Sequence, residues 1–540
     1  MRKIRDYIKA VISNFRPDSY QMVLIDRLRS ENRKFGSKRK AEIWIEYYPY
    51  PEALNTFSEC SKILAEKYGA RIRGVTLSRW PKFLFLLNDR TTTLIYRLLG
   101  CTDFLFVEHQ KVDPGSVTNL VAELFPKIAS KRDLLNLEVL GYKIGTDIYE
   151  AFLREKNQPT LDIKSAEFKQ FFVGCVRNIL FFRDYFQNND VKALLLSHGV
   201  YRLGILGRVA AAHGVVVLVT TTRSILRVHN TDFPRCIDFG LYPKLFSKLS
   251  LEQKVSAKDK AKELLDRRIV KADVGVVMPY STKSAFSRFE KSEVRVLDPS
   301  DKLKVLIAPS CFFDLPHCYG GSLFDDFYEW VCFLGQLTEK TDYDWYVKTH
   351  PDSMAENEPV WRDLLLRFPK FRMIPKETSF HQLADEGIRH VLSVYGSVGH
   401  ELPLLGMTVI NSGYNPHIGY NFNITPSTVA EYENVLLNLK NVSLEVDRDE
   451  IYEFFYIHHF TTQLNIDLTF LDYFKEVEKA KELKNENYYF QSFVEQMTVE
   501  RQERYKRRLL WFLEHSKSDW YQELEYREWQ SQKENLSPPL

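Results

Sequence analysis

Short apolar runs that alternate with helical segments most constrain how this chain can fold. Runs with the pattern of buried strands occur at residues 42–48, 71–77, 103–108, 193–197 and 215–219. Helical patterns lie between them, including 52–68, 122–135, 165–188 and 201–213. Continuous apolar runs are typical of strands that are buried on both faces of a parallel sheet. The alternation therefore predicts a doubly wound α/β domain.

A second series of the same kind follows a charged, weakly patterned stretch. Strands are expected at 304–309, 344–348, 371–374, 391–394 and 408–410, with helices at 324–337, 361–368 and 380–386. We therefore predict two Rossmann-like domains, 41–265 and 304–445, joined by a connector at 266–303. Open α/β sheets bind ligands at the carboxyl ends of their strands, so a cleft between the two domains is the expected site.

The flanking segments differ from both series. Residues 1–40 contain twelve Lys and Arg against four Asp and Glu, with apolar residues at helical spacing from Ile4 to Ile12. A basic amphipathic helix of this kind either packs on the domain or lies on an anionic membrane. Residues 446–540 are predicted to be helices rich in aromatic and charged residues. They are expected to return to the first domain or to contact a membrane.

Bulk composition excludes several classes of protein. The chain has 540 residues, 44% hydrophobic and 27% charged, which is typical of globular multidomain proteins. A net charge of +3 argues against a nucleic-acid partner. The seven cysteines form no CxxC motif, which favours a reducing compartment. We find no signal peptide and no apolar run long enough for a membrane span, so a cytoplasmic protein is expected.

The second domain has three polar loops, each after a predicted strand. The stretch Tyr395–Gly399 is a turn of small residues between a strand and a helix, followed by Glu401. Backbone N–H groups of such a turn suit a phosphate, and Glu401 suits a sugar hydroxyl. We therefore predict that Tyr395, Gly396, Ser397, Gly399 and Glu401 bind a nucleotide, although an ordinary βαβ packing turn has the same pattern.

The other two loops add donors at the same sheet edge. Lys348, His350 and Pro351 belong to the motif KTHP, and Ser310 follows the strand KVLIAP. His350 could donate a hydrogen bond to a departing phosphate. A strand-capping role for His350 is the alternative. Because the three loops follow strands of one sheet, they are expected to converge.

The first domain has two candidate groups. Asp147 and Glu150 lie on one helical face, where a carboxylate could act as base or nucleophile at an anomeric carbon, or form a surface ion pair. His198 follows the buried strand ALLL at the expected cleft. Tyr201, Arg202 and Arg208 follow on the next helix, where the arginines could hold an acidic acceptor or could simply be solvated.

The segments SHGVYRLGILGRVAAAHGVVV, GYKIGTDIYEAFLRE, VKTHP and SVYGSVGHELPLLGMTVI resemble bacterial capsule and O-antigen biosynthesis proteins. That group includes Kdo transferases and, more distantly, teichoic-acid glycerophosphotransferases. The resemblance spans roughly residues 40–440. It implies a GT-B-like fold, a nucleotide-sugar donor with CMP-linked sugars favoured, and neither cofactor nor essential metal.

By the same resemblance, His350 and the turn at 397–401 would bind the nucleotide, and Asp147 or Glu150 would face the anomeric centre. Our hypothesis is a metal-independent glycosyltransferase that builds bacterial surface polysaccharide or glycolipid, with CMP-Kdo as the first donor to test. A saccharide or lipid-linked acceptor and peripheral contact with the inner membrane are expected. The alternatives are a CDP-glycerol-type glycerophosphotransferase and a non-catalytic nucleotide-binding subunit.

Overall fold

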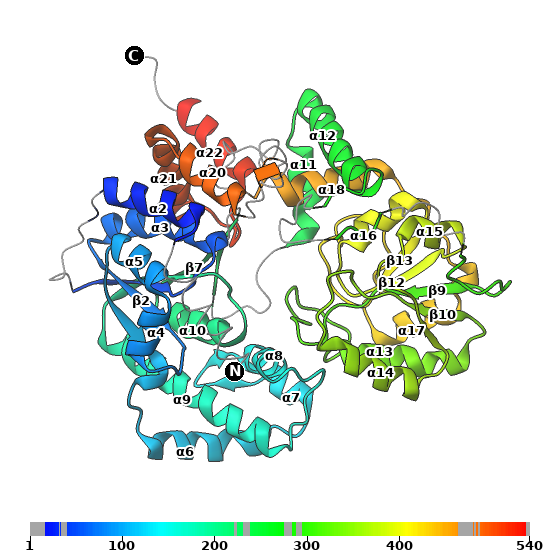
Figure 1. Cartoon of the computed structure of the whole chain (residues 1–540), viewed down its shortest axis with the longest axis horizontal. Coiled ribbons are helices and arrows are strands. Elements are labelled where there is room, and N and C mark those ends of the chain that lie inside the picture. Colours follow the sequence, from blue (N-terminus) through cyan, green and yellow to red (C-terminus); the bar gives the residue numbers. More distant parts are fainter. Residues whose placement is uncertain are drawn as a thin grey trace.

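The computed structural model describes residues 17–31, 33, 40–220, 224–229, 238–274, 283–287, 294–462, 479, 482–483 and 487–535. It consists of two α/β domains and a group of C-terminal helices (Figure 1). Most of the basic segment 1–40 lies outside the described residues. Within it, α2 (Ser19–Glu31) packs on the first domain, and its Tyr20 hydroxyl donates to Asn55 at 3.0 Å.

The first domain is built around a six-stranded sheet in the order β3-β2-β1-β6-β7-β8. The strands are parallel except β8, which runs antiparallel to β7 at the edge. Trp44 and Ile45 of β1 are fully buried on opposite faces, as expected for a central strand. The bounds are β1 Glu42–Glu46, β2 Arg71–Thr76, β3 Cys101–Phe106, β6 Val191–Leu196, β7 Val216–Thr220 and β8 Ile225–Arg227.

Helices cover both faces of this sheet, with one apolar core on each side. One predicted helix is wrong in its bounds: the segment 122–135 is interrupted at Pro126, which cannot donate a backbone hydrogen bond. Chain order gives α3 Pro51–Tyr68, α4 Lys82–Asn88, α5 Arg90–Leu98, α6 Pro114–Leu124, α7 Lys131–Leu135, α8 Gly145–Lys156, α9 Ala166–Asn188 and α10 Tyr201–Ala212.

The second domain contains a five-stranded, fully parallel sheet in the order β11-β10-β9-β12-β13. Every residue of β9, β10 and β12 is buried, which explains why these strands were readable as apolar runs. The bounds are β9 Lys304–Ile307, β10 Asp344–Val347, β11 Phe371–Met373, β12 His390–Ser393 and β13 Thr408–Asn411, with helices α13 Phe327–Leu337, α14 Asn357–Arg367, α15 Phe380–Asp385, α16 Val398–Glu401 and α17 Val429–Leu437.

Two parallel sheets of this kind, with a helical C-terminal extension, confirm the predicted GT-B-like fold class. The domain boundary differs from our prediction, however. Helices α11 (Tyr242–Ser247) and α12 (Leu251–Ile269) share a core with β12 and with α18 (Arg448–Phe460). The structure thus places the described residues 239–269 with the second domain, because their apolar faces are buried there.

The last helices return to the first domain. Phe490 of α20 (Tyr488–Gln496) and Tyr505 and Phe512 of α21 (Val499–Glu514) are buried in the core that also contains β1. Backbone hydrogen bonds join Arg227 N to Asp519 O and Tyr521 N to Ile225 O, so the C-terminal segment extends the edge of the first sheet. The helix α22 (Glu523–Asn535) follows. These helices therefore have a packing role.

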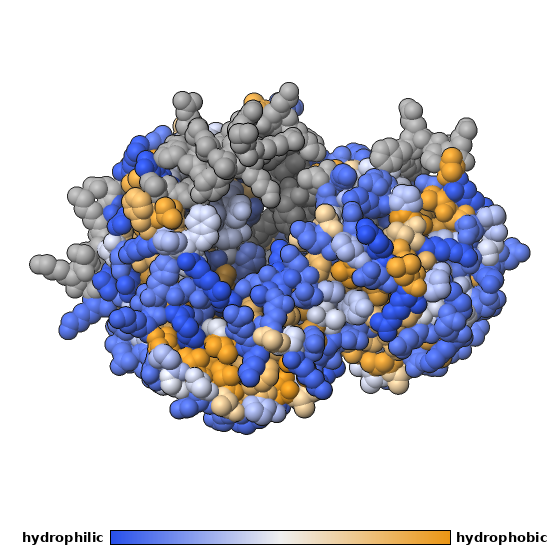
Figure 2. All heavy atoms as spheres, turned by 60° about the horizontal axis from the view of Figure 1, so that its bottom comes forward, coloured by the Kyte–Doolittle hydropathy of each residue, from blue (hydrophilic) through white to orange (hydrophobic). Residues whose placement is uncertain are grey.

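The surface of the two domains is mixed in character. On the face shown in Figure 2, hydrophilic residues dominate and hydrophobic residues form patches on both lobes. None of the helices in the described ranges is long and apolar enough to span a bilayer.

Candidate functional site

The strand order of each sheet reverses at one point, and this point indicates where a ligand would bind. In the first sheet the reversal lies between β1 and β6, and in the second between β9 and β12. Open α/β sheets leave a crevice at the carboxyl ends of the strands flanking such a reversal. Glu46 and Ser197–His198 stand at this place in the first domain. Ser310 and the turn after β12 stand there in the second.

Glu46, Ser197 and His198 form a hydrogen-bonded series at the first reversal. The Glu46 carboxylate accepts a hydrogen bond from the Ser197 backbone N–H at 2.6 Å and one from the Ser197 hydroxyl. The Ser197 hydroxyl oxygen lies 2.8 Å from His198 Nδ1. When this hydroxyl donates to Glu46, its oxygen accepts from His198 Nδ1–H. The neutral imidazole then carries its basic lone pair on Nε2.

The surroundings of Glu46 disfavour the ionised form of its carboxyl group. It is 8% exposed, and burial raises its pKa to about 7, although the hydrogen bonds from Ser197 oppose the shift. Its side chain lines a cavity of about 220 Å³ with Thr76, Ser78 and Leu206. Buried carboxylates that titrate near neutrality and face a cavity are typical of functional sites.

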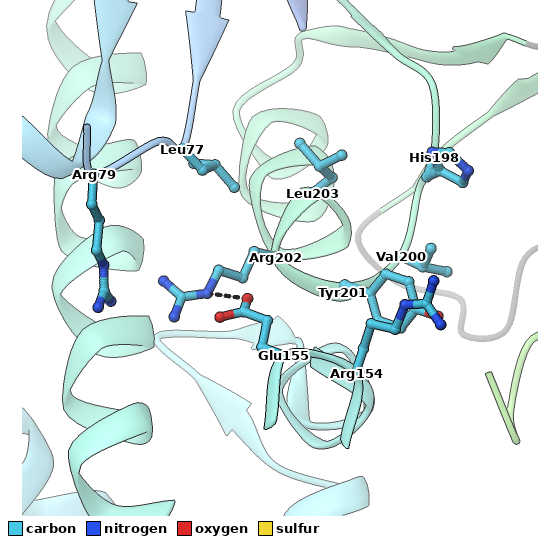
Figure 3. Close-up of a pocket in the computed structure, with 9 residues that line it drawn as sticks. All are labelled: Leu77, Arg79, Arg154, Glu155, His198, Val200, Tyr201, Arg202 and Leu203. Atoms are coloured by element: carbon cyan, nitrogen blue, oxygen red, sulfur yellow. Dashed lines mark ion pairs between the residues drawn. The ribbon is translucent and has the colours of Figure 1, made fainter. Parts of the chain in front are cut away.

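A larger pocket of about 560 Å³ adjoins this cavity through Leu77 and Leu203. His198 is exposed in it, and Figure 3 shows Arg202 pointing toward Arg79 while Arg154 lies beside Tyr201. The lining carries three arginines against one carboxylate, Glu155. The pocket therefore suits an anionic ligand.

The arginines of the pocket are held to different extents. Arg202 Nε lies 2.6 Å from Glu155, and its guanidinium stacks 4.9 Å from the Phe171 ring, which fixes its position. Arg79 is mostly exposed and lies 3.4 Å from Glu108. Arg154 contacts the Met354 sulfur of the second domain at 3.6 Å. Arg202 is therefore a fixed guanidinium that also lies 3.3 Å from Glu108, and its acceptor-binding role remains a prediction.

Tyr201 connects the pocket to the second domain and stores backbone strain. Its φ angle is +56°, a left-handed conformation that costs a non-glycine residue about 1–2 kcal/mol. The Tyr201 hydroxyl donates to Asp314 at 3.0 Å. The pocket therefore lies at the junction of the two domains.

The two carboxylates of α8 are closed to solvent. Asp147 is fully buried and pairs with Arg208 Nε at 2.6 Å, and Arg208 is itself only 1% exposed. A Cβ on Gly204 would come within 2.0 Å of the Asp147 carboxylate, so this glycine allows the close approach. As the structure stands, neither Asp147 nor Arg208 can meet a substrate without opening this pair. Their predicted catalytic and acceptor-binding roles remain predictions.

Glu150 faces the second domain rather than an open pocket. Its Oε1 accepts from the His317 backbone N–H at 2.9 Å and lies 3.4 Å from His317 Nδ1. Nearby, the Tyr149 hydroxyl donates to Asp326 at 2.5 Å. This face of α8 joins the two domains, and a role of Glu150 in catalysis remains a prediction.

In the second domain, His350 is exposed and has a defined tautomer. Its Nδ1 accepts from the Asp352 backbone N–H at 3.0 Å, so the proton of the neutral ring is on Nε2. Pro351 is buried and fixes the turn. Lys348 is 3% exposed and donates to the Lys376 carbonyl at 3.0 Å, and burial lowers its pKa to about 8. His350 is thus the open donor of the motif, and Lys348 supports the strand end.

The turn after β12 has the predicted strand–turn–helix form, although α16 has only four residues before a 3₁₀ turn at Leu402–Leu405. The Tyr395 hydroxyl donates to the Leu315 carbonyl at 2.7 Å. Gly396 and Ser397 are partly exposed, as is Ser310. Gly399 is required for packing, since a Cβ there would lie 2.4 Å from the His417 ring.

Glu401 is not open to a ribose in this structure. It is 2% exposed and forms an ion pair with Arg268 at the end of α12. A further pocket of about 440 Å³ lies beside the KTHP motif and is lined by Thr349, Ser353, Trp361 and Lys376. Thr349, which directly precedes His350 in the chain, belongs to the lining of this pocket.

Sequence reasoning overlooked Glu46 and Arg79. Glu46 ends the apolar run EIWIE, so a polar residue at the carboxyl end of a central strand was the available signal. In the described parts of the chain, His, Cys, Asp and Glu form no group of three or more that could hold a metal ion.

Comparison with known proteins gives distant structural similarities. No protein-family model and no curated protein sequence matches this chain. Among solved structures, KpsC from Thermosulfurimonas dismutans, a β-Kdo 2,4 transferase, is 14% identical with a TM-score of 0.30, covering 50% of this chain and 80% of that one. A glycosyltransferase from Rickettsia africae is 10% identical with a TM-score of 0.27, covering 82% and 99%. TM-scores this low give no evidence of a shared function.

Proposed function

We propose that this chain is a GT-B-type glycosyltransferase that moves a sugar from a nucleotide donor, with a CMP-linked donor favoured, to a saccharide or lipid-linked acceptor of bacterial surface polysaccharide. The observation that supports this most is the pairing of two polar strand-end sites. His198 stands in an arginine-lined pocket of one domain, and His350 stands in the other. Tyr201 and Arg154 join that pocket to the second domain.

In the proposed reaction, His198 Nε2 takes the proton of an acceptor hydroxyl. The acceptor oxygen forms a bond to the anomeric carbon, and the bond from that carbon to the phosphate oxygen breaks. The nucleotide leaves with the bonding electrons, and His350 Nε2–H donates to its phosphate. A positioned base of this type contributes about 10²–10⁴-fold to rate. Arg202 would hold an acidic group of the acceptor.

The donor would lie along the carboxyl ends of β9, β10 and β12. Backbone N–H groups at Ser397 and the hydroxyl of Ser310 would contact the phosphate, and the pocket beside Thr349 would take the nucleoside. We propose that the reaction needs no metal ion, because His350 and the turn after β12 could stabilise the leaving phosphate. Unchanged turnover after chelation by EDTA is the expected outcome.

A donor screen tests the proposal. The protein is incubated with CMP-Kdo, UDP-sugars or GDP-sugars and an oligosaccharide acceptor, and transfer and binding are both measured. We expect transfer from a CMP-sugar. His350→Ala should weaken CMP binding about tenfold or more, as a lost hydrogen bond to a charged group does. Failure to bind or transfer from any nucleotide sugar would contradict the proposal.

Product analysis distinguishes the alternatives. A glycerophosphotransferase would yield a phosphodiester, whereas a glycosyltransferase would form a glycosidic bond. Phosphorus in the newly formed linkage would therefore favour a glycerophosphotransferase. Nucleotide binding without turnover would favour a non-catalytic subunit. Glu401→Ala gives a further check: because Glu401 pairs with Arg268, a loss of stability is expected in addition to any loss of donor binding.

A further inference from the structure

The segment Arg79–Arg90, which contains α4, has apolar side chains on two sides. Phe85 and Leu86 pack on the core, and the Phe85 ring lies 4.9 Å from Tyr47 and 5.4 Å from Phe106. On the other side, Trp80, Phe83 and Leu84 are 48%, 73% and 50% exposed. A helix that is apolar all round is normally buried. Here the anchored side leaves three large side chains in solvent.

The charge of this segment is one-sided. Arg79, Lys82 and Arg90 are exposed, although Arg79 also lies 3.4 Å from Glu108 of the neighbouring segment. The single acid within Arg79–Arg90, Asp89, caps α5 by accepting from the Thr92 backbone N–H at 3.1 Å. Exposed Trp, Phe and Leu flanked by Lys and Arg form the composition that binds the interface of an anionic bilayer. Aromatic side chains bury about 150–250 Å² each, so three side chains fall short of the roughly 800 Å² per partner of a typical protein interface.

The segment also adjoins the arginine-lined pocket. Leu77 and Arg79 line that pocket, and α4 begins three residues later. Figure 1 shows α4 at the surface of the first domain, clear of the second. We infer that Arg79–Arg90 docks on anionic phospholipid and holds the mouth of the pocket at the membrane surface. The link to a lipid-linked acceptor rests on the proposed function, but the lipid contact does not.

Vesicle sedimentation tests the inference with the full chain. Vesicles of phosphatidylethanolamine and phosphatidylglycerol are compared with vesicles of phosphatidylcholine alone, at low and at high salt. We expect binding to the anionic vesicles that high salt weakens. The triple variant Trp80→Ala, Phe83→Ala, Leu84→Ala should bind at least about tenfold more weakly. Lys82→Gln and Arg90→Gln should each weaken binding about fivefold.

A matched triple variant controls for general loss of exposed apolar surface. Leu251, Leu366 and Val499 are 80%, 79% and 76% exposed, and their replacement by alanine should leave vesicle binding unchanged. Three outcomes would each overturn the inference. The Trp80/Phe83/Leu84 variant could bind vesicles as well as the wild type does, the control variant could lose as much vesicle binding as that variant, or the wild type could bind no vesicles.

Catalysis is measured separately, on a short soluble acceptor without vesicles. Both triple variants should retain wild-type turnover there, because none of the six residues lies in the pocket. A protein that binds vesicles through Arg79–Arg90 but transfers no sugar would contradict the proposed function alone. A protein that transfers sugar but binds no vesicles would contradict the membrane inference alone.

Discussion

Asp147 and Glu46 are both buried carboxylates of the first domain, but they have opposite surroundings. Asp147 has a buried guanidinium beside it, and the pair is closed on all sides. Glu46 has only uncharged hydrogen-bond partners and faces a cavity. A paired buried charge is expensive to break, whereas an uncompensated one titrates near neutrality. The comparison indicates that Asp147 holds Arg208 within the fold, whereas Glu46 is the carboxylate that faces a cavity; a catalytic role for either residue remains a prediction.

The largest expected effect is the loss of stability caused by Asp147→Ala. This change leaves Arg208 buried without its carboxylate and should lower the free energy of unfolding by about 3–5 kcal/mol. Denaturant titration measures it. Glu123→Ala, which removes an exposed pair with Lys127, is the control and should change stability by less than about 1 kcal/mol. A loss for Asp147→Ala as small as that of the control would remove the distinction from Glu46.

The next effect is on turnover. His198→Ala should lower kcat about 10²–10⁴-fold while leaving the unfolding free energy and nucleotide affinity unchanged, because His198 is exposed in the pocket. His515→Ala, at a half-exposed histidine of the C-terminal helices, should have wild-type turnover. Retained turnover in His198→Ala would exclude His198 as the base and would favour a carboxylate of α8, Asp147 or Glu150, in that role.

Glu46→Gln should change how stability depends on pH. The folded pKa of Glu46 is about 7, above its ordinary value of 4.5, so the folded state holds this proton more tightly than the unfolded state. Wild-type stability from this group is therefore full below pH 4.5 and is lost as pH rises through 7, by at most about 3 kcal/mol. The variant lacks this loss.

Unfolding curves at about pH 4 and pH 8 measure the difference. The variant should be more stable than the wild type at the higher pH and closer to it at the lower. Its turnover should fall at the same time, because the glutamine cannot orient Ser197 and His198 as a carboxylate does. Parallel pH dependence of the two proteins would show that Glu46 resembles Asp147 after all.

The smallest effect is on the domain junction. Tyr201→Phe removes the hydrogen bond to Asp314 and should cost about 1 kcal/mol, measured as a shift in unfolding midpoint. Tyr50→Phe, at an exposed tyrosine, should cause no shift. An unchanged unfolding midpoint for Tyr201→Phe would mean that the junction is held by the other contacts between the domains, including Lys131–Glu329 and Glu150–His317.

Within the described residues, sequence reasoning placed all ten parallel strands to within about two residues, because a strand buried on both faces is a local apolar run. The site depended on contacts between distant residues. Glu46 meets Ser197 across 151 positions, and Asp147 meets Arg208 across 61. Helical spacing showed that Asp147 and Glu150 share a face, but it could not show that this face is covered. The same limitation misplaced α12, whose partner α18 lies almost two hundred residues later.

The bonds between β8 and residues 519–521 have a consequence for the order of synthesis. The edge of the first sheet is completed by residues 519–521, which are synthesised after both sheets. During translation the outer edge of β8 stays unpaired until these residues are made. The strands of the second domain can pair with one another before then. Chains that end before residue 487 would keep the open edge permanently and should aggregate through it.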